Sequence, residues 1–268
     1  MKNYLFDLYP NFPKGFRLIG YIDPDSHSKE LYDDLRSTFF SDKQNELIGI
    51  ESVENRLQQY GNYPEFYTLF VDTDKFLLSS DCIGASIYWA ALAGLWEDEI
   101  IDFLRISRTL GGHIVFPRGE NNHIAYRFPA NKFGKEHPIT MNNSRGGEKG
   151  YYDRFDLTLF AIKRLFENQE ISNKLMEKAW LNYSDWFDLF RKENNGFKTF
   201  VDFFKLNDFV DNDYEVYDLT TYDVDINKYN ILENDSEWIP DTITGYRQYV
   251  SGVNHAIELR NNRLSLKK

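Results

Sequence analysis

"FYTLFVDTDKFLLSS", residues 66–80, decides the fold class of this chain. It predicts two short strands joined by the turn Asp72-Thr73-Asp74, because aromatic and aliphatic runs flank a short polar connection. Strands joined by so tight a turn pair in the antiparallel sense. A second hairpin is predicted over 111–128, where PRGENN is the connection between two strands.

Helices are predicted on both sides of these hairpins. Residues 23–40 begin with capping side chains and repeat apolar residues every fourth position, which is typical of an amphipathic helix. Further helices are predicted over 79–110, 153–167, 171–192, 197–206 and 241–264. The order helix, hairpin, helix, hairpin, helices predicts an α+β fold, mostly helical, with one or two β-hairpins forming a small antiparallel sheet.

The predicted boundaries follow from local signals. Ser79, Ser80 and Asp81 are expected to cap the 79–110 helix, and Gly111 and Gly112 to end it. The segment 207–237, acidic and rich in tyrosine, mixes possible strands with loops. The chain shows no internal repeat, low-complexity tract or long linker, so 1–268 is expected to be a single integrated α+β domain.

Composition excludes several classes of protein. There is no Gly-rich fingerprint after a strand, which argues against a dinucleotide-binding or P-loop unit. The single cysteine, Cys82, excludes an intrachain disulfide and is expected to be a buried thiol. The start lacks an apolar signal core, and ASIYWAALAGLW is too short to span a bilayer. A cytoplasmic protein without metal, cofactor or membrane contact is expected.

Charge is distributed unevenly along the chain. The formal net charge is −11, which argues against a general nucleic-acid coat protein. Between residues 105 and 164, eleven Lys or Arg face five acids, whereas between 201 and 240 eleven acids face two lysines. A basic centre beside an acidic segment is one interpretation, and solvated faces that neutralise one another are the other.

The stretch 139–166, ITMNNSRGGEKGYYDRFDLTLFAIKRLF, contains the candidate ligand site. Its second half predicts a helix in which Asp153 is the cap and Asp156 occupies the third position. Phe155, Leu159, Ile162 and Phe166 recur three or four residues apart and are expected to face the core.

The first half of this stretch has features that a helix start does not need. Asn143 and Arg145 precede Gly146 and Gly147, a loop in which the backbone can approach a ligand closely. Together with Arg154, such a loop could hold a phosphate or carboxylate through bidentate hydrogen bonds. The alternative is that Arg145 and Arg154 pair with Asp153 and Asp156 and fix the loop.

Histidines near this stretch are candidate proton carriers. His113 and His123 lie near opposite ends of the paired strands predicted within 111–128, and imidazole titrates near neutral pH. Neither a His-x-His pair nor a His-Glu-x-x-His helix is present, so no metal ligands are assigned.

Several segments together resemble a known family. These are DPDSHSKELYDDLRSTFFSDK, FLLSSDCI, HIVFP, NNSRGG, YYDRFDLTLFAIKRLF and FVDFFKLNDFV. They are similar to an uncharacterised bacterial domain-of-unknown-function family whose members carry Arg-Gly and then Asp-Arg-Phe-Asp-Leu-Thr-Leu. The resemblance implies one integrated fold and a bacterial or phage origin, and points to Asn143, Arg145, Asp153, Arg154 and Asp156, without implying a reaction.

Two functions follow as hypotheses. The first is binding of a phosphate-bearing ligand, a nucleotide or RNA, with Arg145 and Arg154 holding the anion. If the protein is an enzyme, His113, His123 and Asp153 would then support metal-independent nuclease or nucleotide-directed transferase chemistry. The second is a non-enzymatic interaction module in which the acidic segment 207–237 docks a basic protein partner.

Overall fold

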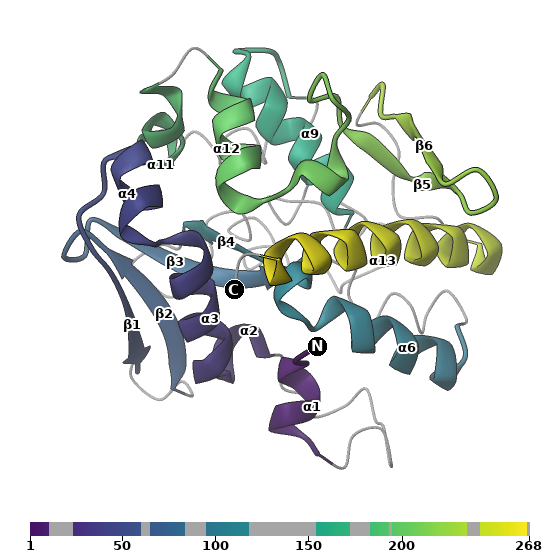
Figure 1. Cartoon of the computed structure of the whole chain (residues 1–268), viewed down its shortest axis with the longest axis horizontal. Coiled ribbons are helices and arrows are strands. Elements are labelled where there is room, and N and C mark those ends of the chain that lie inside the picture. Colours follow the sequence, from purple (N-terminus) through teal and green to yellow (C-terminus); the bar gives the residue numbers. More distant parts are fainter. Residues whose placement is uncertain are drawn as a thin grey trace, which may run out of the picture.

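Two antiparallel sheets organise the protein. The computed structural model describes residues 1–10, 24–59, 65–83, 95–117, 154–171, 183–192, 195–234 and 242–266. Four strands form one sheet in the order β1 (Val53–Gln58), β2 (Phe66–Val71), β3 (Phe76–Cys82), β4 (His113–Pro117). A separate hairpin pairs β5 (Tyr217–Asp223) with β6 (Lys228–Ile231). Figure 1 shows these sheets among the helices, and the predicted α+β fold is confirmed.

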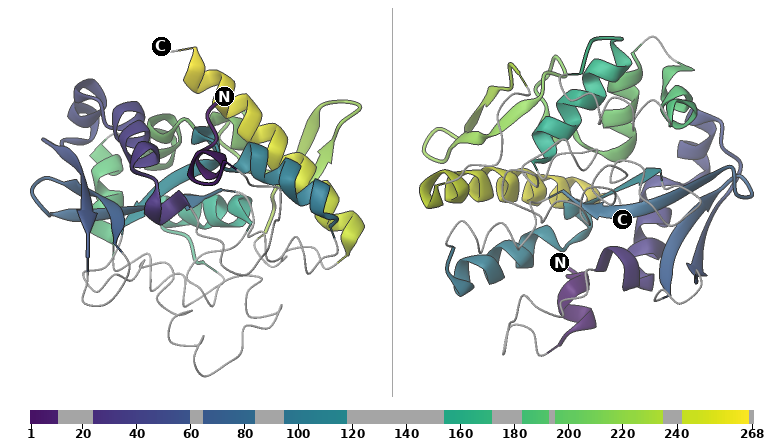
Figure 2. Two further views of the ribbon diagram at one scale, coloured as in Figure 1. Left: turned by 90° about the horizontal axis from the view of Figure 1, so that it is seen from below. Right: turned by 180° about the vertical axis from the view of Figure 1, so that it is seen from behind.

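Helices pack around both sheets and connect them. In chain order they are α1 (Tyr4–Leu8), α2 (Pro24–His27), α3 (Lys29–Phe39), α4 (Asp42–Ile48), α6 (Glu97–Ser107), α9 (Phe155–Phe166), α11 (Ser184–Asp188), α12 (Gly196–Phe204) and α13 (Ile243–Ser265). Short 3-10 turns are η1 (Leu110–Gly112), η3 (Leu189–Lys192) and η4 (Asn207–Phe209). The long α13 contacts both α6 and β5, and Figure 2 shows this arrangement from two further sides.

The predicted hairpin over 66–80 is confirmed. Val71 pairs with Phe76, so the chain reverses through the intervening turn. Asp72, Thr73 and Asp74 all have positive φ values, which aspartate tolerates better than most residues. The Asp72 carboxylate also accepts the N–H of Ser52, at 3.1 Å, and therefore ties the turn to the start of β1.

The predicted helix over 79–110 is wrong at its start. Ser79, Ser80 and Asp81 lie in β3 and pair with β4, in register with Phe116, Val115 and Ile114. Serine and aspartate are common at helix starts, where their side chains bond to free backbone N–H groups. Here the backbone groups of these residues are bonded to β4 in the sheet instead. Within the described part of this range, the helix is α6, which begins at Glu97.

Side-chain caps were predicted at the starts of the helices over 23–40 and 153–167, and the structure shows such a cap only in the first. In α3 the Ser28 hydroxyl accepts the N–H of Leu31 at 3.1 Å, which confirms a serine cap. In α9 the cap residue is Arg154, not Asp153, and no side chain caps the helix there. The predicted core stripe of α9 is confirmed, since Phe155, Leu159, Ile162 and Phe166 are all buried.

Two other predicted segments lie partly outside the described residues. Of the 171–192 helix, the structure describes α11 and η3, while Ile171 is buried but not helical. Of the 111–128 hairpin, it describes β4, and 118–128 lie outside. The closing helix is confirmed as α13, with Thr242 as its cap.

An aromatic cluster joins α11, η3 and α12. Phe200 lies 5.2 Å from Phe190 and 4.9 Å from Phe204, measured between ring centroids. Trp186 and Phe190 form an edge-to-face pair at 5.5 Å. Such arrangements suit the ring quadrupoles and bury large areas, so these rings belong to the core.

Gly252 lets α13 approach β5 closely. A Cβ atom built on this glycine would lie 2.1 Å from the Leu219 carbonyl oxygen and 3.1 Å from the Tyr222 Cβ. The Gly252 carbonyl also accepts a hydrogen bond from the Tyr229 hydroxyl at 2.8 Å. The contact between α13 and the β5–β6 hairpin therefore depends on the missing side chain.

Replacing Gly252 with alanine should destabilise the protein. The added methyl group meets backbone, so α13 must shift, and overpacking of this kind costs about 1–3 kcal/mol in the free energy of unfolding. Urea denaturation measures this change. Ser251→Ala, at the exposed neighbouring position of the same helix, is the control and should change stability by less than about 0.5 kcal/mol. Equal stability of the two variants would contradict the proposed close contact.

Candidate functional site

Arg154 lies in a buried ion cluster with two carboxylates. Its Nε donates to Asp156 Oδ1 at 3.1 Å, and its Nη2 donates to Asp156 Oδ2 at 2.5 Å. The same Nη2 donates to Asp218 Oδ1 at 2.9 Å. Arg154 and Asp156 are both fully buried. Because Asp218 belongs to β5, the cluster joins the start of α9 to the second sheet.

Hydrogen bonds from β5 complete this cluster. The N–H of Leu219 donates to Asp156 Oδ2 at 2.9 Å. The backbone and hydroxyl of Thr220 both donate to Asp218 Oδ1, at 2.9 and 2.6 Å. Burial lowers the pKa of Arg154, but attraction to the two carboxylates outweighs it and holds this pKa above its usual range.

This geometry distinguishes the two roles that the sequence left open for Arg154. The structure shows it paired with internal acids, Asp156 as expected and Asp218 in addition. A ligand anion at this guanidinium would have to share it with two carboxylates. Asn143, Arg145, Gly146, Asp153 and His123 lie outside the described residues. The phosphate site that combines Arg145 with Arg154 stays a prediction.

His113 belongs to a second buried network, at the start of β4. Its Nδ1 lies 2.8 Å from Asp25 Oδ1 and 3.2 Å from the Ser80 hydroxyl. The Ser80 hydroxyl itself donates to Asp25 Oδ1 at 3.4 Å. Asp25 and Ser80 thus both contact Nδ1 of His113. In a catalytic triad, by contrast, the acid contacts one ring nitrogen of the histidine and the nucleophile contacts the other. The expectation that His113 carries protons in catalysis stays a prediction.

Asp25 was not foreseen as a partner of His113. The sequence indicated a turn followed by a helix at Asp25, and the residue does lie in α2. Its carboxylate nevertheless turns toward a histidine 88 positions later in the chain, on β4. A sequence that lacks a short-range His-Asp motif gives no signal for such a pair.

Cys82 is less enclosed than expected. The predicted buried thiol is partly exposed at the end of β3, so that expectation is corrected. Its sulfur accepts a hydrogen bond from Arg108 Nη1 at 2.6 Å. The thiol also donates to the Ser107 carbonyl at 3.4 Å, which places the end of β3 beside the end of α6.

Arg260 joins α13 to the four-stranded sheet through hydrogen bonds to backbone carbonyls. Its guanidinium donates to four backbone carbonyls: Gly111 (2.7 Å), His113 (2.8 Å), Phe204 (2.8 Å) and Lys205 (3.1 Å). Burial lowers the pKa of Arg260 to about 9, so the group remains protonated at neutral pH. The guanidinium of Arg260 therefore holds α13 against these backbone segments and does not serve as a ligand site.

An open groove lies between η4, the β5–β6 hairpin and α13. Its volume is about 380 Å³. It is lined by Asn207, Asp208, Asp211, Tyr217, Asn227, Lys228, Tyr229, Ile231, His255 and Leu259. All but His255 and Leu259 come from the acidic, tyrosine-rich segment predicted over 207–237. The structure thus brings part of that segment together with one face of α13.

Aromatic rings form one wall of this groove. Tyr217 and Tyr229 stack at 5.0 Å between centroids, and Tyr222 stacks on His255 at 4.5 Å. Burial raises the pKa of Tyr217, and the negative charges of Asp211 and Asp208 raise it further. The carboxylates of Asp211 and Asp208 therefore lie close to the Tyr217 ring.

The acids of the groove have distinct structural roles. Asp208 accepts two hydrogen bonds from the Arg263 guanidinium, at 2.8 and 3.0 Å. Asp211 Oδ1 accepts the N–H groups of Asp213 and Glu215, which fixes the turn before β5. These bonds hold both carboxylates at the groove, and Asp213 on the turn is exposed.

The described residues form an α+β fold with an open groove lined by aspartates, tyrosines and Lys228. Residues 19–264 match the Family of unknown function (DUF6994), and the chain belongs to this family. Comparisons with curated proteins and with solved structures found no match. In the described part of the chain, no helix has the length and apolar character needed to cross a membrane. Nor do the described residues include three or more His, Cys, Asp or Glu grouped as a metal site would require.

Proposed function

We propose that this protein is a non-enzymatic interaction module that docks a basic segment of a partner protein. The observation that carries this proposal is the groove between η4, the β5–β6 hairpin and α13, where acids and stacked tyrosines border one open space. It corresponds to the interaction function that the sequence suggested for residues 207–237.

The chemistry of the groove favours a lysine or arginine side chain. A cation placed over Tyr217 would interact with the ring face, and such contacts contribute about 0.5–2 kcal/mol. Asp211 borders the same space and supplies a carboxylate for such a cation, whereas Asp208 is already paired with Arg263. Tyrosine also suits protein interfaces, because it combines a large contact area with a hydroxyl group.

The hairpin loop beside the groove adds apolar contacts. Val224 and Ile226, in the turn between β5 and β6, are 70% and 67% exposed. They alternate with Asp223 and Asp225, which are exposed too. A partner segment that pairs basic residues with an aliphatic anchor would match this pattern, because exposed apolar residues rimmed by charges are typical of interaction sites.

Charge substitution in the groove and its loop should weaken binding of a basic peptide about tenfold, since three surface charge contacts together contribute about 1.4 kcal/mol. The variant is Asp211→Asn/Asp213→Lys/Asp225→Lys, in which asparagine keeps an oxygen for the turn at 211. The probe is a fluorescent peptide that alternates lysine and leucine, and anisotropy measures its dissociation constant at physiological salt.

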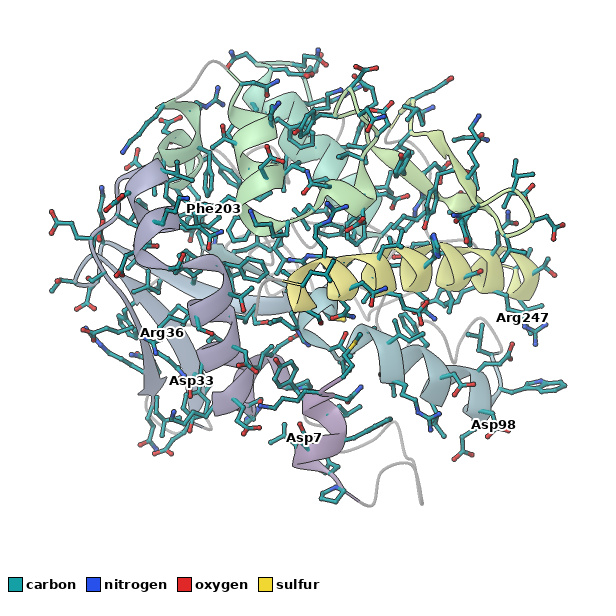
Figure 3. All side chains as sticks on the ribbon, in the orientation of Figure 1. Asp7, Asp33, Arg36, Asp98, Phe203 and Arg247 are labelled. Atoms are coloured by element: carbon teal, nitrogen blue, oxygen red, sulfur yellow. The ribbon has the colours of Figure 1, made fainter. Side chains whose placement is uncertain are left out.

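The control variant changes the net charge equally on other elements. Glu46→Gln/Glu51→Lys/Asp98→Lys alters three exposed acids on and after α4 and on α6; Figure 3 labels Asp98. It should bind the peptide like the unmodified protein. Equal loss in both variants would show general charge attraction, and no loss in the groove variant would refute the proposed docking site.

A further inference from the structure

A second groove lies between α4 and α12. Its volume is about 620 Å³. The residues that line it are Gln44, Leu47, Lys192, Asn195, Lys198, Thr199, Asp202, Phe203 and Lys205. Figure 3 labels Phe203, whose ring stands edge-on to that of Phe40 at the end of α3. The lining therefore combines three ammonium groups, several neutral polar groups and two apolar side chains.

The charge of this groove is opposite to that of the chain. Among the described residues that line it, three lysines face one acid, Asp202, in a protein with a formal net charge of −11. The Asp202 carboxylate is already engaged, because it accepts hydrogen bonds from Asn207 Nδ2 at 2.7 Å and from the Tyr214 hydroxyl at 3.2 Å. The local balance thus favours a negatively charged occupant.

The structure holds the three lysines at the groove. Lys192 Nζ donates to the Ile48 carbonyl at 2.7 Å, at the end of α4. Lys205 Nζ donates to the Asp202 carbonyl at 2.6 Å. Lys198 Nζ lies 4.9 Å from the centre of the Tyr214 ring. An ammonium carries three N–H donors, so the bond of Lys192 to one carbonyl does not exhaust them.

We propose that this groove binds a phosphorylated small molecule of nucleotide size, with its phosphates at the lysines. The groove volume falls within the range of about 300–1,000 Å³ that small-molecule sites occupy. Lysine binds phosphate as a point charge, and three lysines suit a chain of phosphates better than a single one. Leu47 and Phe203 offer an apolar surface for a ring at the other end of the molecule.

This inference does not depend on the proposed docking of a basic partner. The two grooves use different residues, and the charge preferences are opposite. It does keep the expectation of a phosphate-bearing ligand that the sequence suggested. This groove would use surface lysines for such a ligand, whereas the site at Arg145 and Arg154 stays a separate prediction.

Thermal unfolding with added phosphates tests the proposal. Pyrophosphate and ATP, each in excess over its dissociation constant, should raise the melting temperature by about 5 °C. AMP should raise it less, and adenosine should not raise it. The Lys198→Gln/Lys205→Gln variant should lose this increase. Calorimetric titration should show at least a tenfold weaker affinity for ATP, because two charge-assisted contacts are removed.

Matched variants and salts separate this site from general charge effects. Lys43→Gln/Lys75→Gln removes two exposed lysines elsewhere, and Lys75 lies over the Phe76 ring much as Lys198 lies over Tyr214. It should keep the ATP response. Circular dichroism checks folding, and the exposed single change Lys198→Gln replaces the double variant if folding fails. No response to polyphosphates, an equal response to sodium chloride of the same ionic strength, or an unchanged response in the groove variant would overturn the proposal.

Discussion

Arg154→Met should lower the free energy of unfolding by about 3–5 kcal/mol, since removing one partner from a buried ion cluster leaves the others uncompensated. Asp156 would keep its full burial and its backbone donors but lose the guanidinium. Asp218 would lose the contact that joins β5 to α9. Urea denaturation followed by tryptophan fluorescence measures the change.

A second arginine of the same helix is the control for this prediction. Arg164 lies near the end of α9, over the Phe160 ring, and donates to the Glu170 carbonyl at 3.0 Å. Because it is partly exposed, Arg164→Met should cost less than about 1 kcal/mol. The double variant Arg154→Met/Asp156→Asn should be more stable than the sum of the two single changes implies. A loss at Arg154 no greater than at Arg164 would show that the cluster does not stabilise the fold.

Arg260→Met should destabilise the protein by about 3–4 kcal/mol, because four buried carbonyls lose a charged donor at once. Arg260→Lys should recover part of this loss but not all of it, since one ammonium cannot reproduce the planar fork that reaches Gly111, His113, Phe204 and Lys205. Chemical denaturation of both variants gives the order of stability.

The pH dependence of this effect follows from the lowered pKa of Arg260, about 9. The unfolded chain has the higher pKa, so it binds more protons above pH 9, and burial of Arg260 makes stability rise with pH only in that range. Between about pH 6 and pH 8 the group is charged in both states. The stability difference between Arg260→Met and the unmodified protein should therefore stay constant there. As a control, Arg263→Met removes the ion pair of a half-exposed arginine with Asp208 and should cost less than Arg260→Met. A difference at Arg260 that varies within this pH interval would contradict the account.

The sequence predicted those elements whose signals are local. Ser28 caps α3 through its own side chain, and the 66–80 hairpin is closed by its own turn. The core stripe of α9 follows from residues at most four positions apart. The failure at Ser79 has the opposite origin, because β3 is fixed by pairing with β4, which lies more than thirty residues further along the chain.

The candidate sites were harder to predict for the same reason. Arg154 and Asp156 were recognised as neighbours, but Asp218 lies 64 residues beyond Arg154 and no short motif announces it. The acidic segment was recognised from its charge, whereas the participation of His255 depends on how α13 packs. Nothing in the spacing of Lys192, Lys198 and Lys205 indicated a groove, because α4 supplies the facing wall.

The order in which a ribosome makes this chain has a consequence for α13. Through Arg260, Gly252 and Arg247, this helix contacts the four-stranded sheet, the β5–β6 hairpin and Glu99 of α6. Residues 243–265 are synthesised after every element that they hold together. While residues 243–265 are still inside the ribosome, the carbonyls of Gly111 and His113 lack the guanidinium donor of Arg260. In the same period β5 lacks its contact with α13. A nascent chain should thus stay open to proteases until α13 emerges.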